Sequence, residues 1–122
     1  MSRVVVLGAS RNRAKFGNKA VRAYRQTGHE VIPINPLAQE IEGCPCYPSI
    51  DVVPGAVDIV SVYLPPERLL EGLPAIARKG CRELWVNPGA ESEAVIEKAE
   101  RLGLNVIQAC SLVGLGLRPS SF

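Results

Sequence analysis

A cluster of basic side chains follows the first apolar run of the sequence. The run Val4–Leu7 leads into the small segment Gly8–Ser10, and three cations follow within five residues, Arg11, Arg13 and Lys15. Small residues let backbone amides approach a phosphate group, and the start of a following helix adds a positive field. The whole chain has 14 basic and 12 acidic side chains, a net charge of +2, so this one loop carries more positive charge than the chain has in excess. The loop is therefore predicted to bind a ligand with several phosphate charges, and a merely solvated basic loop is the alternative interpretation.

This loop lacks the pattern of a dinucleotide-binding fold. That pattern is G-x-G-x-x-G, with an acidic residue at the end of the second strand that binds the ribose. Here residues 8–13 read GASRNR, and the second apolar run ends at Asn35-Pro36. A Gly-Lys-Ser/Thr triplet, which a P-loop requires, is absent from the sequence. These residues argue against NAD and against a P-loop nucleotide, although an NAD(P)-binding redox-sensing or oxidoreductase-related domain stays open as an alternative function.

The sequence contains no obvious catalytic or metal-binding set. His29 is the single histidine and lies in a turn before the second apolar run, at the amino side of a strand, where sites of α/β proteins do not form. We expect it to be a surface turn residue. The four cysteines have no histidine or second cysteine pair at zinc-ligand spacing and are predicted to be reduced thiols; they are Cys44, Cys46, Cys81 and Cys110. Enzymatic activity therefore stays uncertain, and the residues favour a binding protein.

Short apolar runs alternate with helical segments along the chain, and these elements must position the basic loop. Strands are predicted at residues 4–7, 31–34, 57–64, 84–86 and 105–107, and helices at residues 16–27, from Pro65 onward, and at 92–102 with Ser92 as its cap. One more short strand is allowed near Cys46, and residues 111–122 show no clear period. Alternation of this kind predicts one doubly wound, Rossmann-like α/β domain over residues 1–122. Its parallel sheet would have five strands, or six with the segment near Cys46, and helices on both faces.

Composition excludes several classes of protein. Hydrophobic residues make up 47% and charged residues 21% of the 122 residues, as in folded globular domains. A charge of +2 is too small for generic nucleic-acid binding. The apolar runs are far shorter than the roughly 20 residues of a membrane span, and the first residues do not resemble a signal peptide. We therefore expect a cytoplasmic protein without a nucleic-acid or membrane partner.

Several of these segments together resemble a known family. In chain order they are VLGASR at 6–11 with Lys15, VIPINP at 31–36, IEG at 41–43 with YPS at 47–49, VDIV at 57–60 leading to PPE at 65–67, and NPGAE at 87–91. They are similar to the stand-alone CoA-binding proteins, whose domain resembles the N-terminal domain of the succinyl-CoA synthetase alpha subunit and of ADP-forming acyl-CoA synthetases. The resemblance covers essentially the whole chain.

The resemblance implies non-catalytic binding of coenzyme A or an acyl-CoA at the carboxyl ends of the strands. The implied site consists of Gly8, Ala9, Ser10, Arg11, Arg13, Lys15, Phe16, Asn35, Pro36, Val62, Tyr63, Leu64, Pro65 and Gly89. The loop after the first strand would bind the phosphates, and the segments after the second and third strands would line the path of the adenosine and the pantetheine arm. Two departures concern this site, because Leu37 stands where many relatives have a basic residue and Leu64 where many have a charged one.

Some roles stay open at this stage. Tyr63 either stacks on the ligand or packs at the edge of the core, whereas Phe16 and Trp85 are assigned mainly to packing. Cys110 falls at the carboxyl end of a strand, where a buried small residue is the main interpretation and a thiol that pairs with the CoA sulfur is the other. A homodimer is possible, and so is an accessory subunit that docks onto separate acyl-CoA synthetase chains, for which the segment Leu112–Leu117 is the candidate apolar patch.

Overall fold

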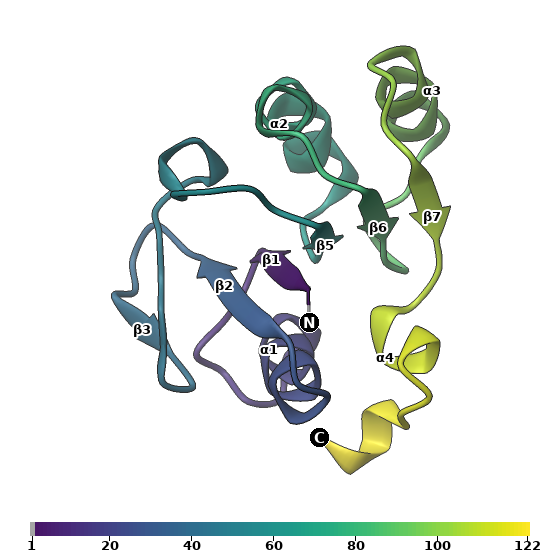
Figure 1. The fold of residues 1–122 in the computed structure, drawn as a ribbon. Helices are drawn as coiled ribbons and strands as arrows, with labels where there is room; N and C mark the ends of the chain where they lie inside the picture. The colour runs from purple at the N-terminus through teal and green to yellow at the C-terminus, as the bar shows by residue number, and fades with distance from the viewer. Residues whose placement is uncertain (1) are drawn as a thin grey trace.

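The computed structural model describes residues 2–122 and contains a parallel sheet of five strands with helices on both faces (Figure 1). The main elements are β1 (Arg3–Leu7), α1 (Phe16–Gln26), β2 (Glu30–Ile34), β5 (Ile59–Val62), α2 (Pro66–Lys79), β6 (Glu83–Val86), α3 (Glu93–Arg101) and β7 (Val106–Gln108). The strand order is β2-β1-β5-β6-β7, and each neighbouring pair is parallel. The predicted doubly wound, Rossmann-like α/β fold is thereby confirmed.

The segment between β2 and β5 differs from the expectation of one short strand. It contains two very short strands, β3 (Glu40–Ile41) and β4 (Cys44–Pro45), which form an antiparallel pair of their own, and a 3-10 turn, η1 (Ile50–Val52). The main sheet therefore keeps five strands and gains no sixth.

The outer edge of β2 is closed by the residue Tyr47. The amide of Asn35 donates to the carbonyl of Tyr47 at 3.0 Å, and the amide of Tyr47 donates to the carbonyl of Pro33 at 3.1 Å. In a strand, the carbonyl and the amide of one residue point to the same side. The carbonyl of Pro33 points away from β1, so the amide hydrogen that a proline lacks is not needed for the hydrogen bonds between β2 and β1. The proline inside this strand is thus tolerated.

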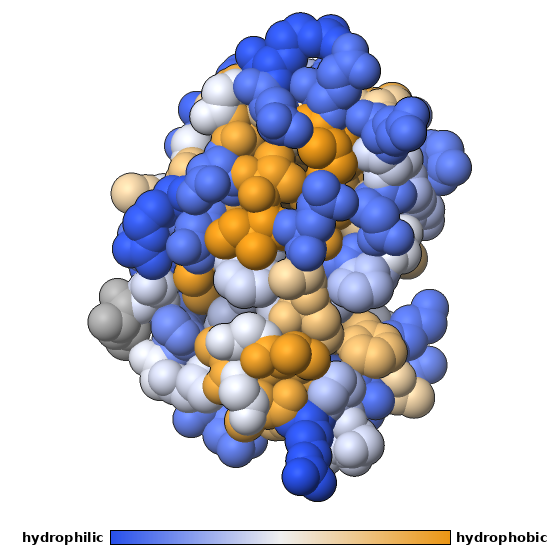
Figure 2. Space-filling model, turned by 90° about the vertical axis from the view of Figure 1, so that its right-hand side faces the viewer, coloured by the Kyte–Doolittle hydropathy of each residue, from blue (hydrophilic) through white to orange (hydrophobic). Residues whose placement is uncertain are grey.

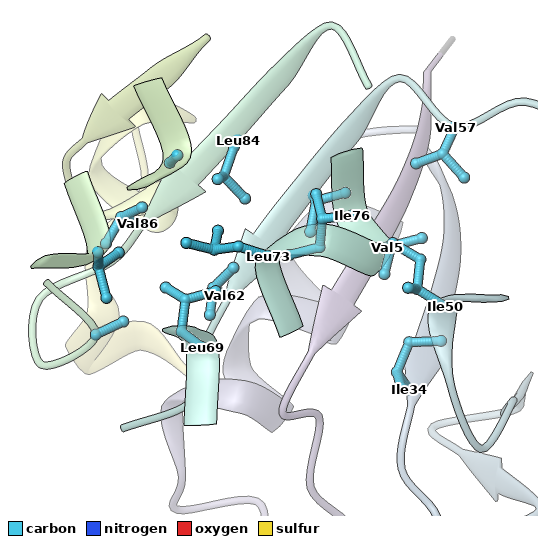
Figure 3. Close-up of a cluster of buried hydrophobic side chains, with 14 of the residues drawn as sticks. Val5, Ile34, Ile50, Val57, Val62, Leu69, Leu73, Ile76, Leu84 and Val86 are labelled. Atoms are coloured by element: carbon cyan, nitrogen blue, oxygen red, sulfur yellow. The ribbon is translucent and has the colours of Figure 1, made fainter. Parts of the chain in front are cut away.

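Two hydrophobic clusters fill the two faces of the sheet. On one face Leu69, Leu73 and Ile76 of α2 pack on Val5 and Val62 of the strands, and α3 extends the same cluster (Figure 3). On the other face α1 packs against the alternate residues of β1 and β2, and the C-terminal segment adds the buried Leu112. The central strands β1, β2 and β5 are buried on both faces, which is the reason that they appear in the sequence as continuous apolar runs.

Local signals explain where the helices begin and how α2 tolerates an internal proline. Ser92 caps α3, as expected, and its hydroxyl accepts from the amide of Val95 at 3.1 Å. Pro74 lies inside α2 and has no amide to donate to the carbonyl of Leu70. The ammonium of Lys98 in α3 donates to that carbonyl at 3.3 Å and so replaces the missing helical bond.

The C-terminal segment, which has no period in the sequence, folds against α1 and β6. It forms the short helix α4 (Ser111–Gly114) and the 3-10 turn η2 (Pro119–Ser121). Gly114 lies on the ring of Trp85, since a β-carbon there would be 2.7 Å from a ring atom. Leu112 is fully buried, whereas Val113 is 62% exposed. Apolar residues remain visible in separate groups on the face formed by α3, β7 and α4 (Figure 2).

His29 is less exposed than predicted for a surface turn. It is half-buried at the amino end of β2, where its ring meets that of Tyr24 edge-on with 5.5 Å between the centroids. Its Nδ1 atom is buried without a hydrogen-bond partner among the described residues. Within residues 2–122, none of the helices combines the length and the apolar character that crossing a membrane requires.

Candidate functional site

The carboxyl ends of β2, β1, β5 and β6 border a cleft of about 900 Å³. Its lining consists of Leu7, Gly8, Ala9, Ser10, Lys15, Phe16, Gly17, Ile34, Asn35, Pro36, Leu37, Tyr63, Leu64, Pro65, Arg68, Pro88, Gly89 and Ala90. The chain moves from β1 through α1 to β2 on one side, and from β5 through α2 to β6 on the other. The cleft therefore lies at the switch point of the sheet, where ligands bind in open α/β folds. The C-terminal segment contributes none of its lining.

Gly8 occupies the centre of the cleft, where β1 and β5 lie side by side. Its φ of +87° falls in the left-handed region, and a β-carbon on it would clash with the carbonyl group of Tyr63, whose carbon would be 2.8 Å away. The amide of Tyr63 in turn donates to the carbonyl of Leu7 at 2.7 Å. The first loop can thus pass directly over the end of β5 only because residue 8 is a glycine.

Gly17 brings the start of α1 against the same loop. A β-carbon on Gly17 would clash with the carbonyl of Gly8, whose carbon would be 3.2 Å away. A glycine in the first helical turn therefore allows close packing of helix and loop, which is one task of the glycines in a dinucleotide fingerprint. The glycine is nine positions after Gly8 here, because the loop is longer than in that fingerprint.

Two asparagine side chains hold the loop in place. Asn35, at the end of β2, donates from Nδ2 to the carbonyl of Ala9 at 3.0 Å and accepts from the amide of Leu37 at 2.8 Å. Asn18, which is fully buried in α1, donates to the carbonyl of Ser10 at 2.9 Å. Both side chains are used to fix backbone, so the loop is organised before any ligand arrives.

The start of α1 offers several hydrogen-bond donors to the cleft. Lys15 is the N-cap residue but makes no side-chain cap, so the amides of Phe16 and Gly17 have no acceptor among the described residues, whereas the amide of Asn18 donates to the carbonyl of Lys15 at 3.1 Å. The amides of Ala9 and Ser10 also donate to no acceptor among residues 2–122. The hydroxyl oxygen of Ser10 accepts from the amide of Asn12 at 3.0 Å, which leaves its own proton free to donate. Together with the ammonium of Lys15, these groups can hold an anion.

Three predicted site residues lie away from the cleft lining. Arg13 points to Glu42 in the turn between β3 and β4, with 3.7 Å between guanidinium and carboxylate, and its carbonyl accepts from Arg22 at 2.8 Å. Arg11 is exposed outside the lining, and Val62 is fully buried in the core below it. The other predicted residues come together in the cleft, and these are Gly8, Ala9, Ser10, Lys15, Phe16, Asn35, Pro36, Tyr63, Leu64, Pro65 and Gly89.

Sequence reasoning missed several lining residues, of which Arg68 matters most, and it noted Leu37 only as a departure from the family and not as part of the site. Arg68 is in the first turn of α2, and Leu37, which is 94% exposed, follows the end of β2. Each had a signal in the sequence. A cation in the first turn of a helix is opposed by the helix dipole, and a large apolar side chain directly after a strand-ending Asn-Pro pair has no core to enter.

Tyr63 lines the cleft and also packs against the cluster on the α1 face, as predicted for a residue at the edge of the core. Stacking on a ligand stays a prediction. The hydroxyl is buried and has no hydrogen-bond partner among the described residues. Burial raises the pKa of this phenol above its ordinary value, so it stays protonated at neutral pH and cannot serve as a base.

A buried polar network supports the floor next to the cleft. Asn87, at the end of β6, donates to the hydroxyl of Ser61 and to the carbonyl of Val62, both at 3.0 Å. Its Oδ1 accepts from the amide of Ser111 at 2.7 Å, and the hydroxyls of Ser61 and Ser111 are 2.8 Å apart. Asn87 therefore joins β5, β6 and the start of α4, and its role is structural.

The thiols show no sign of reactivity. All four cysteines are free, and none of them lines the cleft. Burial raises the pKa of the Cys81 thiol to about 11, and it also raises the pKa values of Cys44 and Cys46. Cys110 packs against the cluster on the α1 face. No group of three or more potential metal ligands gathers anywhere in residues 2–122.

Comparisons with known proteins agree with this geometry. A family model described as "CoA binding domain" matches residues 2–115. The chain is 29% identical over 114 residues to acetate–CoA ligase [ADP-forming] I of Archaeoglobus fulgidus. The matched region covers 85% of this chain and 17% of the ligase. It is 28% identical over 109 residues to the uncharacterized protein YneT of Bacillus subtilis, which covers 86% of this chain and 78% of YneT. The chain thus spans less than a fifth of the ligase.

Solved structures show the same fold. A conserved hypothetical protein from Pyrococcus furiosus superposes with a TM-score of 0.85 at 34% identity, covering 93% of this chain and 99% of that one. The dinucleotide-forming acetyl-coenzyme A synthetase 1 of Ca. Korarchaeum cryptofilum, in complex with phosphate and ADP, superposes with a TM-score of 0.78 at 29% identity. That match covers 88% of this chain and 25% of the synthetase.

Proposed function

The chain belongs to the CoA-binding domain family, and from that premise we propose that it binds coenzyme A or an acyl-CoA in the cleft without itself catalysing a reaction. The observation that carries the proposal is the start of α1, where open amides, the Ser10 hydroxyl and the Lys15 ammonium face a cleft whose other walls are largely apolar. A ligand with a strongly charged centre and apolar ends fits such a site.

The parts of CoA correspond to the parts of the cleft. The diphosphate suits the amides and the cation at the start of α1. The adenosine suits the end beside β2, where Phe16, Pro36 and the exposed Leu37 offer apolar contacts. The thin pantetheine arm suits the other half, where Leu64 and Pro65 form the wall. About 900 Å³ is in the size range of cofactor sites.

The role of Asn35 argues against a dinucleotide such as NAD. In NAD sites an acidic residue at the end of the second strand accepts hydrogen bonds from the ribose hydroxyls. Asn35 stands at this place, but its Nδ2 is bonded to the carbonyl of Ala9 and its Oδ1 to the amide of Leu37. The side chain therefore supports the loop, and its single oxygen already accepts a backbone amide, whereas the carboxylate of an NAD site offers two oxygens to the ribose.

The lining also argues for binding without catalysis. It includes no carboxylate, histidine or cysteine, and the phenol of Tyr63 stays protonated. General acid–base or nucleophilic catalysis needs such groups within reach of the reacting atoms. Besides Ser10 and Lys15, which we assign to the phosphates, the lining offers no candidate nucleophile or base, so we expect any reaction of a bound thioester to need groups from outside it.

Calorimetric titration and thermal unfolding of the whole chain with CoA, acetyl-CoA, dephospho-CoA, NAD and NADP test the proposal. We expect CoA to bind, and a concentration of 100 times its dissociation constant to add about 2.7 kcal/mol to the free energy of unfolding. NAD and NADP are expected to cause no shift at the same concentration. Stabilisation by NAD or NADP without stabilisation by CoA would overturn the proposal.

A further inference from the structure

Two cations line the cleft, and they stand on different walls. Lys15 precedes α1, which packs on one face of the sheet, and Arg68 is the third residue of α2, which packs on the opposite face. Neither side chain makes an ion pair or a hydrogen bond with any residue that the structure describes. Arg68 is exposed, and the helix dipole weakly opposes a cation in the first turn, so an anion in the cleft would stabilise its guanidinium there.

The hydrogen-bond donors around Arg68 differ from those around Lys15. Pro65 and Pro66 at the start of α2 have no N–H, and the amide of Arg68 itself donates to the carbonyl of Pro65 at 3.1 Å. The start of α2 therefore offers a guanidinium group with few amides beside it. A diphosphate is better served by the amide-rich start of α1, whereas a planar carboxylate matches the two parallel donors of a guanidinium.

The strand order places Arg68 in the half of the cleft that suits the pantetheine arm. Asn35 and Leu37 follow β2 at one end, whereas Arg68 follows β5 and lies toward the segment after β6. The lining of this half is otherwise apolar, with Leu64, Pro65, Pro88 and Ala90. An anion in this half, beyond an uncharged arm, belongs to the acyl group.

From these observations, and resting on the proposed function, we infer that the protein prefers an acyl-CoA whose acyl group ends in a carboxylate, and that Arg68 is the residue that recognises this carboxylate. Arg68 is then a specificity-determining residue of the cleft. Its neighbour Glu67 and the nearby Glu91 do not line the cleft, and Glu91 accepts from the amide of Gly89 at 2.8 Å.

Calorimetric titrations with succinyl-CoA and butyryl-CoA test this inference, because the two acyl groups have the same number of carbons and differ in the terminal carboxylate. The wild-type chain is expected to bind succinyl-CoA about tenfold more tightly than butyryl-CoA, which is the effect of one charge-assisted hydrogen-bond pair. Arg68→Gln should abolish this preference and leave the affinities for CoA and butyryl-CoA within about twofold of those of the wild-type chain. Arg82→Gln is the matched control, since Arg82 is an exposed arginine at the amino end of β6 and should change nothing.

The possible failures are distinguishable. A wild-type chain that binds CoA but shows no preference for succinyl-CoA would overturn this inference alone. So would an Arg68→Gln variant with equally weaker affinity for all three ligands, because Arg68 would then serve a phosphate. Absence of binding of any CoA compound to the folded wild-type chain would overturn the proposed function as well.

Discussion

The α-carbon of Gly17 packs so closely on the carbonyl of Gly8 that a β-carbon on Gly17 would lie 3.2 Å from the carbonyl carbon and closer still to the oxygen. Gly17→Ala is therefore expected to lower the free energy of unfolding by about 2 kcal/mol through overpacking, and to weaken CoA binding by shifting the loop. Urea unfolding and calorimetric titration measure the two effects. Gly72→Ala is the control, because Gly72 lies in α2 with open space around it and the change should stabilise the chain by about 0.5–1 kcal/mol. Equal behaviour of the two variants would contradict the role of the Gly8–Gly17 contact.

The two basic residues Lys15 and Arg13 are expected to differ in their effect on CoA affinity. Lys15 lines the cleft, whereas Arg13 faces Glu42 outside it. Lys15→Gln should weaken CoA binding about tenfold, the effect of one charge-assisted contact to phosphate, and Arg13→Gln should change it less than about twofold. Calorimetric titration at two salt concentrations checks this. Salt screens the attraction between Lys15 and phosphate, so the difference in CoA affinity between wild type and Lys15→Gln should shrink at high salt. The reverse ranking of the two variants would show that the loop turns Arg13 toward the ligand.

Asn87 is predicted to be important for stability although it makes no contact with a ligand. Asn87→Ala leaves the buried amide of Ser111 and the carbonyl of Val62 without their partner, which should cost about 2–3 kcal/mol. Asn105→Ala is the comparison, because Asn105 makes one exposed hydrogen bond to the carbonyl of Arg82 at 3.2 Å and its loss should cost less than about 0.5 kcal/mol. Thermal unfolding followed by the fluorescence of Trp85 measures both. Similar melting temperatures for the two variants would refute the structural role of Asn87.

Cys81 is expected to react slowly with thiol reagents at pH 8 and to make stability pH-dependent in alkali. Its pKa is raised by burial to about 11 from an ordinary value of 9, so the folded state favours the protonated thiol. This contribution to stability is present below pH 9 and is lost as the pH rises toward 11, because the unfolded chain releases the proton first. Urea unfolding between pH 8 and pH 11 should show a steeper loss for the wild type than for Cys81→Ala. A Cys81 that is labelled at pH 8 as fast as a thiol in the urea-unfolded chain would contradict this prediction.

The main elements could be predicted from the sequence because the central strands β1, β2 and β5 are buried on both faces and each long helix has one apolar stripe. The runs at Val4–Leu7 and Val31–Ile34 therefore match β1 and β2 closely. The short helix α4 could not be predicted, since four residues are too few to show a period and Gly114 is placed by its contact with Trp85. Near Cys46 one short strand was expected, whereas the structure has the antiparallel pair β3 and β4, whose strands of two residues are too short to show a pattern.

The candidate site could be predicted in its position but only partly in its residues. The rule for open α/β sheets places a site at the carboxyl ends of the strands, and the segments after β1, β2, β5 and β6 line the cleft, whereas the segment after β7 does not. The direction of each side chain depends on contacts that are distant in sequence, such as that of Arg13 with Glu42. Arg68 was missed because its access to the cleft depends on the face of the sheet on which α2 packs.

The helices that border the cleft are anchored in different clusters, α1 in the one that contains Val21 and α2 in the one that contains Leu73. A bound molecule that contacts the start of both helices would link the two sides of the sheet. Local opening of either side would then require its release, so amide hydrogen exchange at Val21 and at Leu73 should slow together on binding. The ligand would thus be part of what keeps the two sides of the molecule closed.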